Sequence, residues 1–214
     1  MASENPPSPF YPGELREIIL GSGEVTNRKF DPSHMTALDS EKRKEMLPVE
    51  KIIGAVDLPE EAIVADIGCG TGYLTIPLAR KMPRGRVFAV DIEPRMLSVL
   101  TERARGLDNI TIVHSTENDI PVADNILDIS FLVAVLHEFH NLEDFLKEIR
   151  RISRPGHYVV VVDWDEKKTD MGPPAHIRIP KDTAISLFRA HGYELAREFA
   201  PSAYFYGLLF QRKK

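Results

Sequence analysis

The residues best suited to chemistry lie in one short stretch at the end of an apolar run. Asp66 closes this run and is followed by Gly68, Gly70 and Gly72, three glycines at alternate positions. Glycine allows the backbone to bend sharply and lets a ligand approach where a Cβ would collide. The pattern therefore predicts a strand, a tight turn and a helix that together bind a nucleotide-like ligand.

A second acid, Asp91, ends the next apolar run. In an open α/β sheet, an acid at this place can accept hydrogen bonds from ribose hydroxyls. Tyr73 stands where the G-x-G-x-x-G fingerprint of dinucleotide sites has its third glycine, because that glycine comes one residue early, at Gly72. Asp66 also places a negative charge where a diphosphate is disfavoured and an ammonium group is favoured. The spacing thus favours an adenosine ligand with an amino group over a dinucleotide.

A histidine and a glutamate follow the strand expected at 126–134. His137 could act as a general base because the pKa of histidine lies near neutrality. Glu138 could orient either this histidine or a substrate, and solvated or helix-capping residues are the alternative for both. Cys69, inside the glycine turn, is expected to pack and not to act as a nucleophile.

Further residues could line the substrate side of the site. Trp164 could instead pack on the tail of the chain, and Arg178 could bind an anionic substrate or lie on the surface as an ordinary arginine. His34 and Met35 could close over the ligand or dock on the surface. The candidate substrate-binding residues are His34, Met35, Asp163, Trp164 and Arg178.

Alternating strands and helices must position these side chains. Repeated alternation with short connections predicts a parallel sheet with helices on both faces. The last two strand-like runs are joined by four residues, too few for a crossover helix, so they must pair antiparallel. The expected strands are 62–67, 86–90, 110–113, 126–134, 158–162, 193–199 and 204–210, and the expected helices are 74–82, 96–105, a segment capped by Asn141, and 183–190.

Three segments are expected along the chain. Residues 1–33 form a proline-rich arm, residues 34–58 form a helical cap in which Pro48 separates two helical pieces, and residues 59–214 form the core.

Composition restricts the classes of function. The 214 residues are 43% hydrophobic and carry a formal net charge of -5, which gives no electrostatic footprint for nucleic acid or an anionic membrane. A single cysteine allows neither an intramolecular disulfide nor a cysteine-based metal site. The first residues lack the features of a secretory signal, and no run of about 18 apolar residues could span a membrane. The sequence predicts a cytoplasmic protein with no metal, and leaves the oligomeric state open.

Several motifs together resemble class I S-adenosylmethionine-dependent methyltransferases. Residues 66–72 resemble motif I of this family, and 87–92 resemble the acidic strand end that follows it. Residues 125–139 and 152–162 are similar to the fourth and fifth strand motifs, the latter with an Arg154-Pro155-Gly156 turn. The resemblance covers about residues 35 to 212 and is nearest the ubiquinone- and menaquinone-biosynthesis-like branch, which acts on small molecules, so it implies a small-molecule methyl acceptor. It implies a Rossmann-like, seven-stranded, mostly parallel sheet with an antiparallel last strand, helices on both faces and an N-terminal helical cap.

The resemblance also implies roles for residues around S-adenosylmethionine. Asp66 would help to hold its amino group and Asp91 its ribose, while Gly68 and Gly70 would lie under its methionine part. Ile92 and Met96 would flank the adenine. The family often has Gly-Asp after the third strand, where this chain has His114-Ser115-Thr116-Glu117, so Ser115, Thr116 and Glu117 are the substitutes. The full expected cofactor set is Asp66, Gly68, Cys69, Gly70, Gly72, Asp91, Ile92, Met96, Ser115, Thr116, Glu117 and Val133.

Methyl transfer from a sulfonium is an in-line displacement, so positioning of the acceptor can supply most of the rate. A base such as His137 is needed only if the acceptor loses a proton. Arsenite methyltransferases resemble this core but use several cysteines, and Cys69 stands alone. A nicotinamide-dependent oxidoreductase and a non-catalytic module that binds the cofactor are the alternatives.

Overall fold

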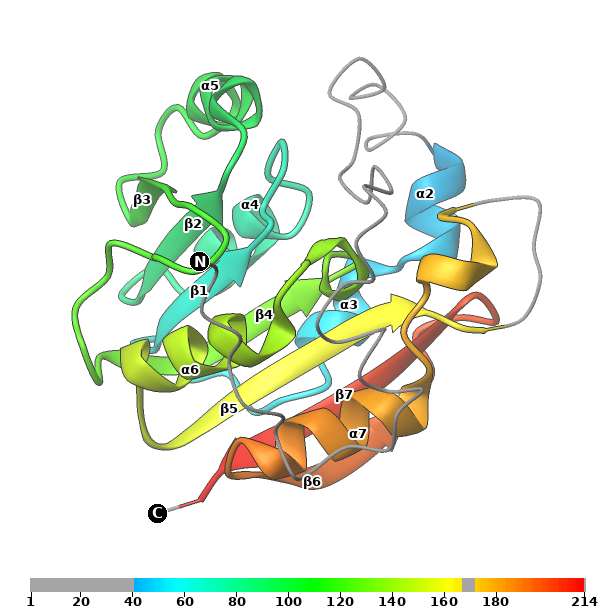
Figure 1. Ribbon diagram of the computed structural model, residues 1–214. Helices are drawn as coiled ribbons and strands as arrows, with labels where there is room; N and C mark the ends of the chain where they lie inside the picture. The colour runs from blue at the N-terminus through cyan, green and yellow to red at the C-terminus, as the bar shows by residue number, and fades with distance from the viewer. Residues whose placement is uncertain (1–40, 167–171, 214) are drawn as a thin grey trace, which may run out of the picture.

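The computed structural model describes residues 41–166 and 172–213 (Figure 1). Within these residues, seven strands form one sheet in the order β3-β2-β1-β4-β5-β7-β6. β7 runs antiparallel to both of its neighbours, whereas the pairs from β3 to β5 are parallel. The predicted sheet with a reversed last strand is therefore confirmed. The strands are β1 Ile63–Ile67, β2 Arg86–Asp91, β3 Ile110–His114, β4 Leu127–Val133, β5 Ser153–Trp164, β6 Tyr193–Phe199 and β7 Phe205–Arg212.

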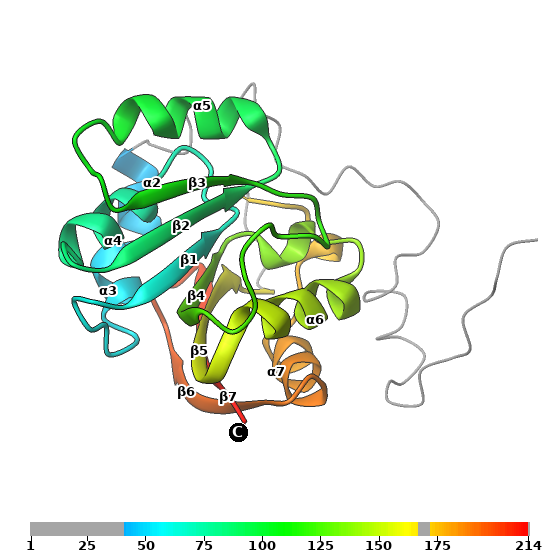
Figure 2. The ribbon, with the colours of Figure 1, turned by 90° about the vertical axis from the view of Figure 1, so that its left-hand side faces the viewer.

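Helices cover both faces of the sheet, as predicted. Figure 2 shows α3, α4 and α5 on one face and α6 and α7 on the other. Throughout the described ranges, every helix is too short or too polar to cross a lipid bilayer. The helices are α2 Glu41–Met46, α3 Val49–Ile53, α4 Thr75–Lys81, α5 Pro94–Arg103, α6 Leu142–Ile152 and α7 Lys181–Ala190, with short 3-10 helices η2 Leu136–Glu138 and η3 Ala175–Ile177.

The alternation of side chains along β5 divides the core into two layers. Val159 and Val161 pack on the side of α6 and α7, whereas Val160 and Val162 pack on the side of α3 and α4. The apolar stripe of α6 is fully buried, and the predicted cap is present because the side chain of Asn141 accepts a hydrogen bond from the backbone of Asp144. The apolar face of the strands and the apolar face of the helices thus pack against each other in the same core.

The strand order determines where a ligand can bind. β1 lies between β2 and β4. The chain proceeds from β1 to β2 and β3 on one side, and then crosses back to β4 and β5 on the other side of β1. In open α/β sheets this switch point opens a crevice at the carboxyl ends of the strands. We call this side of the sheet the carboxyl edge. The glycine turn, Asp91 and His137 all follow strand ends there.

The segment before the core is helical where it is described. Pro48 precedes α3 and separates it from α2, which confirms the predicted break. Leu47, Ile52 and Ile53 are buried beneath the sheet face that carries α4. Residues 1–33 and the first part of the expected cap, 34–40, lie outside the described residues.

Several predicted boundaries were wrong, those of β5 and α5 most clearly. The Arg154-Pro155-Gly156 turn lies inside β5, which begins at Ser153, because the pairing with β4 continues through a shift in register between Leu127 and Ile129. The helix expected at 96–105 begins earlier, at Pro94, since proline suits a first helical position and the side chain of Glu93 caps it.

Candidate functional site

The glycine turn after β1 is attached to β2 by hydrogen bonds. Gly68 N and Cys69 N both donate to Val90 O, at 2.8 and 3.0 Å. Gly68 and Gly72 have φ angles of 71° and 92°, in the region that favours glycine. A Cβ at Gly68 would lie 2.4 Å from Val135 Cγ2, so the chain after β4 packs directly on this turn. Glycine is therefore needed here for packing within the chain as well as for the bend.

Asp91 connects the end of β2 to the glycine turn. Its Oδ2 accepts a hydrogen bond from Gly70 N at 2.8 Å, and its Oδ1 accepts one from Glu93 N at 2.9 Å. Burial raises the pKa of Asp91, and the backbone donors reduce this effect without cancelling it. A carboxylate has about four lone-pair positions, so Asp91 can accept further bonds from two ribose hydroxyls.

Asp66 is buried behind the turn. Its Oδ2 accepts a hydrogen bond from Thr75 Oγ1 at 2.5 Å. Burial raises the pKa of Asp66 to about 7, a rise that the Thr75 bond lessens and the charge of Asp91 adds to. This carboxyl group titrates near neutral pH, so an ammonium group placed beside it would favour its ionised form. Thr75 was not singled out by the sequence, although it begins the helix that follows the turn.

Other expected cofactor residues surround these two acids. Cys69 is buried, and burial raises the pKa of its thiol well above the usual range, so the thiol stays neutral and packs. Met96 is buried at the start of α5, Ile92 is half-buried just before it, and Val133 is buried at the end of β4. All of them therefore lie at or near the carboxyl edge.

Ser115 and Glu117 connect the segment after β3 to neighbouring segments by hydrogen bonds. Ser115 N donates to Asp91 O at 3.1 Å. Glu117 Oε1 accepts bonds from His140 N at 2.6 Å and His140 Nδ1 at 2.9 Å. Thr116 is exposed, and its backbone donates to Asp119 O. Glu117, one of the three candidates for the adenine contact, thus connects the segment after β3 with the segment after η2.

The end of β4 brings His137 over β5. Ala134 has a φ of 55°, which is uncommon for a residue other than glycine, and it turns the chain into η2. His137 Nδ1 then lies 2.7 Å from Asp163 Oδ1, and His137 N donates to Asp163 Oδ2 at 3.2 Å. Trp164 N donates to Asp163 Oδ1 at 2.7 Å. Asp163 therefore fixes both the backbone and the ring of His137.

The His137–Asp163 pair is almost fully buried, with 6% and 0% of the two side chains exposed. Burial lowers the pKa of His137, but the charge of Asp163 and its hydrogen bond outweigh burial, so the pKa is raised. With Nδ1–H donating to Asp163, the lone pair of the neutral ring lies on Nε2, as a general base requires. The sequence suggested that Glu138 could orient the ring of His137, but Asp163 makes this contact. Glu138 is half-buried beside the pair, and its charge adds to the raised pKa.

Trp164 and Arg178 pack against each other. The Trp164 ring lies 4.3 Å from the ring of Phe205, and the Arg178 guanidinium lies 5.3 Å from the Trp164 ring centroid. Arg178 is buried and donates to the carbonyls of Pro173 and Asp165, each at 2.9 Å. Arg178 therefore attaches the loop before α7 to the end of β5, and the idea of an ordinary surface arginine was wrong. His34 and Met35 lie outside the described residues.

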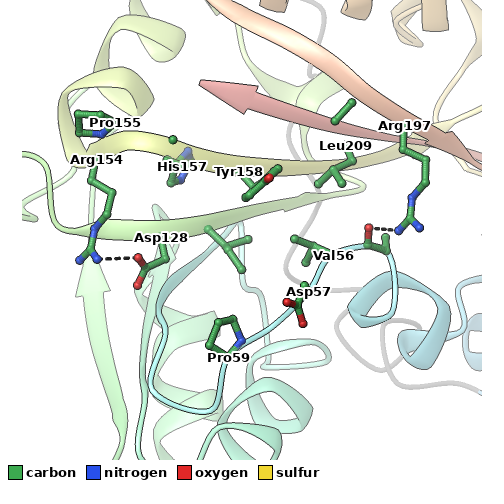
Figure 3. A pocket seen from close by; sticks show the side chains of 14 residues that line it. Val56, Asp57, Pro59, Asp128, Arg154, Pro155, His157, Tyr158, Arg197 and Leu209 are labelled. Atoms are coloured by element: carbon green, nitrogen blue, oxygen red, sulfur yellow. Dashed lines mark hydrogen bonds and ion pairs between the residues drawn. The ribbon is translucent and has the colours of Figure 1, made fainter. Parts of the chain in front are cut away.

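A cavity of about 560 Å³ lies at the opposite edge of the sheet, where β4 and β5 begin (Figure 3). Its rim carries two arginines that already have partners within the chain. Arg154 pairs with Asp128 at 2.6 Å, and Arg197 donates to the carbonyl of Ala55. This cavity is separate from the glycine turn, Asp91 and His137, so the candidate site is the carboxyl edge.

Comparisons with known proteins agree on one kind of enzyme. A family described as a methyltransferase domain matches residues 65–161. Demethylmenaquinone methyltransferases from Tropheryma whipplei (strain Twist) and Staphylococcus aureus (strain JH9) are 33% identical over 110 and 105 residues, which cover 51% and 47% of this chain. These alignments cover 45% and 42% of the two relatives, so this chain matches less than half of their length.

A solved structure matches nearly the whole fold. The crystal structure of a SAM-dependent methyltransferase from Aquifex aeolicus is 30% identical to this chain, with a TM-score of 0.82. The match covers 86% of this chain and 99% of that one.

Proposed function

This chain belongs to the S-adenosylmethionine-dependent methyltransferases, and we propose that it methylates a ring carbon of a small quinol with His137 as general base. The observation that carries this proposal is the buried pair of His137 and Asp163 at the carboxyl edge. Membership of this family decides against a nicotinamide-dependent oxidoreductase. The names of the demethylmenaquinone methyltransferase relatives support a quinol as the acceptor.

The chemistry of the carboxyl edge fits the cofactor. Asp91 keeps lone pairs for ribose hydroxyls, and Asp66 titrates near neutral pH, which suits an amino group as its partner. Gly68 and Gly70 would lie under the methionine part, and Met96 would flank the adenine. When bound, S-adenosylmethionine supplies a methyl group on a sulfonium and leaves as S-adenosylhomocysteine with the electron pair of the broken carbon–sulfur bond.

The residues of the chain act on the acceptor. Asp163 holds the ring of His137 so that Nε2 faces outward from the pair with its lone pair. Nε2 takes the proton of a quinol hydroxyl, and the resulting oxygen charge is shared with the neighbouring ring carbon, which forms the bond to the methyl carbon. The hydrogen on that ring carbon then leaves as a proton to water, which restores the aromatic ring as its phenolate. The phenolate oxygen takes back the proton held on His137 Nε2, which gives the methylated quinol and the neutral base. Burial of the pair excludes competing water from the base.

The test measures transfer of a labelled methyl group to chemically reduced 1,4-naphthoquinone. We expect His137→Gln to lower kcat by about 10²- to 10⁴-fold, the usual contribution of a general base, while the Kd of S-adenosylhomocysteine stays the same. Glu138→Gln is the matched control, because it removes only a neighbouring charge and leaves the base in place. Full activity of His137→Gln would exclude the base. Cofactor binding without transfer to any quinol or phenol would support the non-catalytic module.

We also propose a cytoplasmic location and an acceptor other than nucleic acid. Cys69 is a buried free thiol, which suits a reducing compartment, and the net charge of -5 offers no attraction to phosphate backbones. Cell fractionation tests the location, and a binding assay at low salt tests the absence of affinity for nucleic acid.

A further inference from the structure

A buried tyrosine lies beside the His137–Asp163 pair. Tyr206, the second residue of β7, is the register partner of Asp163 on β5. Paired residues on antiparallel strands point to the same face of a sheet, and the ring of Tyr206 packs in the core layer of α6 and α7. β5 lies between β4 and β7, so Asp163 at the end of β5 has His137, from η2 just after β4, on one side and Tyr206 of β7 on the other.

The hydroxyl of Tyr206 has no partner in the described part of the chain. The residue is 6% exposed, and its buried oxygen makes no hydrogen bond to residues 41–166 or 172–213. Buried polar groups in folded proteins are nearly always hydrogen-bonded, so an exception calls for a ligand or an ordered water. Asp163, the carboxylate nearest in register, already accepts bonds from His137 N, His137 Nδ1 and Trp164 N.

This hydroxyl keeps its proton. Burial raises the pKa of Tyr206 well above its usual range, and the charges of Asp163, Glu166 and Asp165 at the end of β5 add to the rise. Tyr206 is therefore a neutral O–H donor in register with Asp163, the residue that holds the candidate base.

We infer that the Tyr206 hydroxyl donates a hydrogen bond to the second oxygen of a quinol whose first hydroxyl faces His137. This inference rests on the proposed function. A hydroquinone carries two oxygens on opposite sides of one ring system, and the base consumes only one of them. The second oxygen can accept a hydrogen bond, and the protonated phenol of Tyr206 is a donor in register with Asp163.

The experiment compares Tyr206→Phe with the unaltered chain. We expect the KM for reduced 1,4-naphthoquinone to rise about tenfold, as for the loss of one hydrogen bond. The inhibition constant of 1-naphthol, which lacks the second oxygen, should not change, and neither should the Kd of S-adenosylhomocysteine. The melting temperature should stay equal or rise, because no bond within the described chain is lost.

Tyr193→Phe is the matched control. Tyr193 is also fully buried and packs in the same core layer. It begins β6 and pairs with Arg212, at the end of β7 away from Tyr206 and the carboxyl edge. We expect the KM for the quinol to be unchanged in this variant.

Each outcome decides the matter. An unchanged KM for the quinol in Tyr206→Phe overturns the inference. A lower melting temperature, together with an equal loss of affinity for the quinol and for 1-naphthol, also overturns it, because the hydroxyl would then have a structural role. No transfer by the unaltered chain overturns the proposed acceptor and the role of Tyr206 with it. Transfer by the unaltered chain with no change in Tyr206→Phe overturns the role of Tyr206 alone.

Discussion

Binding of the cofactor should weaken as the pH falls, because Asp66 becomes neutral. The pKa of Asp66 is raised to about 7 by burial, so its carboxyl group is mostly neutral at pH 6. If only the ionised form receives the amino group of the cofactor, the apparent affinity follows the ionised fraction. This fraction rises about eightfold between pH 6 and pH 7.5, and the Kd should fall by about that factor.

Calorimetric titration with S-adenosylhomocysteine, which carries the same amino group, measures this change. Asp66→Asn removes the titrating group and should leave a nearly flat profile. Thr75→Val removes the hydrogen bond that lowers the pKa of Asp66, so the midpoint of the profile should move to higher pH. The same pH dependence in Asp66→Asn as in the unaltered chain would refute the role of this carboxylate.

The same shift in pKa makes a prediction for stability without ligand. The pKa of Asp66 is raised from 3.8 to about 7, so the folded state holds the proton more tightly than the unfolded state. This contribution is complete below the unfolded pKa and is lost as the pH rises through the folded pKa, with a magnitude of about 4 kcal/mol. Asp66→Asn should therefore raise the melting temperature more at pH 8 than at pH 5.

Three further substitutions test the rest of the site. Asp163→Asn should lower kcat about 100-fold or more. It should also move the acidic limb of the pH–rate profile to lower pH, since the largest contribution that raises the pKa of His137 against burial is then lost; an unmoved limb would contradict this. Arg178→Lys should cost about 1–3 kcal/mol of unfolding free energy in urea, because the carbonyls of two half-buried residues lose a charged donor, whereas equal stability would show that this contact contributes nothing. Gly72→Ala should cost at least about 2 kcal/mol more than Gly106→Ala, since both have positive φ but only Gly72 has a side-chain neighbour within 4 Å; equal losses would mean that the neighbour moves aside.

The elements of the fold could be predicted because their signals are local. The apolar stripe of α6, the cap at Asn141 and the break at Pro48 each depend on residues a few positions apart. The antiparallel pairing of β6 and β7 followed from a connection too short for a crossover. The start of β5 was misplaced because Gly156 indicated a turn, whereas pairing with β4 keeps the segment in the sheet.

The partners within the site could not be predicted in the same way. The sequence placed Glu138 beside His137 because the two are neighbours in the chain, but the ring is held by Asp163, which lies 26 residues away. From the sequence, Arg178 could be an ordinary surface residue. Its burial depends on the packing of the loop before α7 against the end of β5. Nothing in the pattern around Tyr206 distinguishes it from an ordinary core aromatic residue.

The sequence by itself determined the kind of cofactor, because the glycine turn and the acid at the end of β2 are set by short-range backbone geometry. Only the tertiary structure decided which side chains meet at the carboxyl edge, since strand order and register bring together His137 from η2, Asp163 from β5 and Tyr206 from β7. The pKa values of Asp66 and His137 also depend on burial, which is a property of the packed core and not of any one segment.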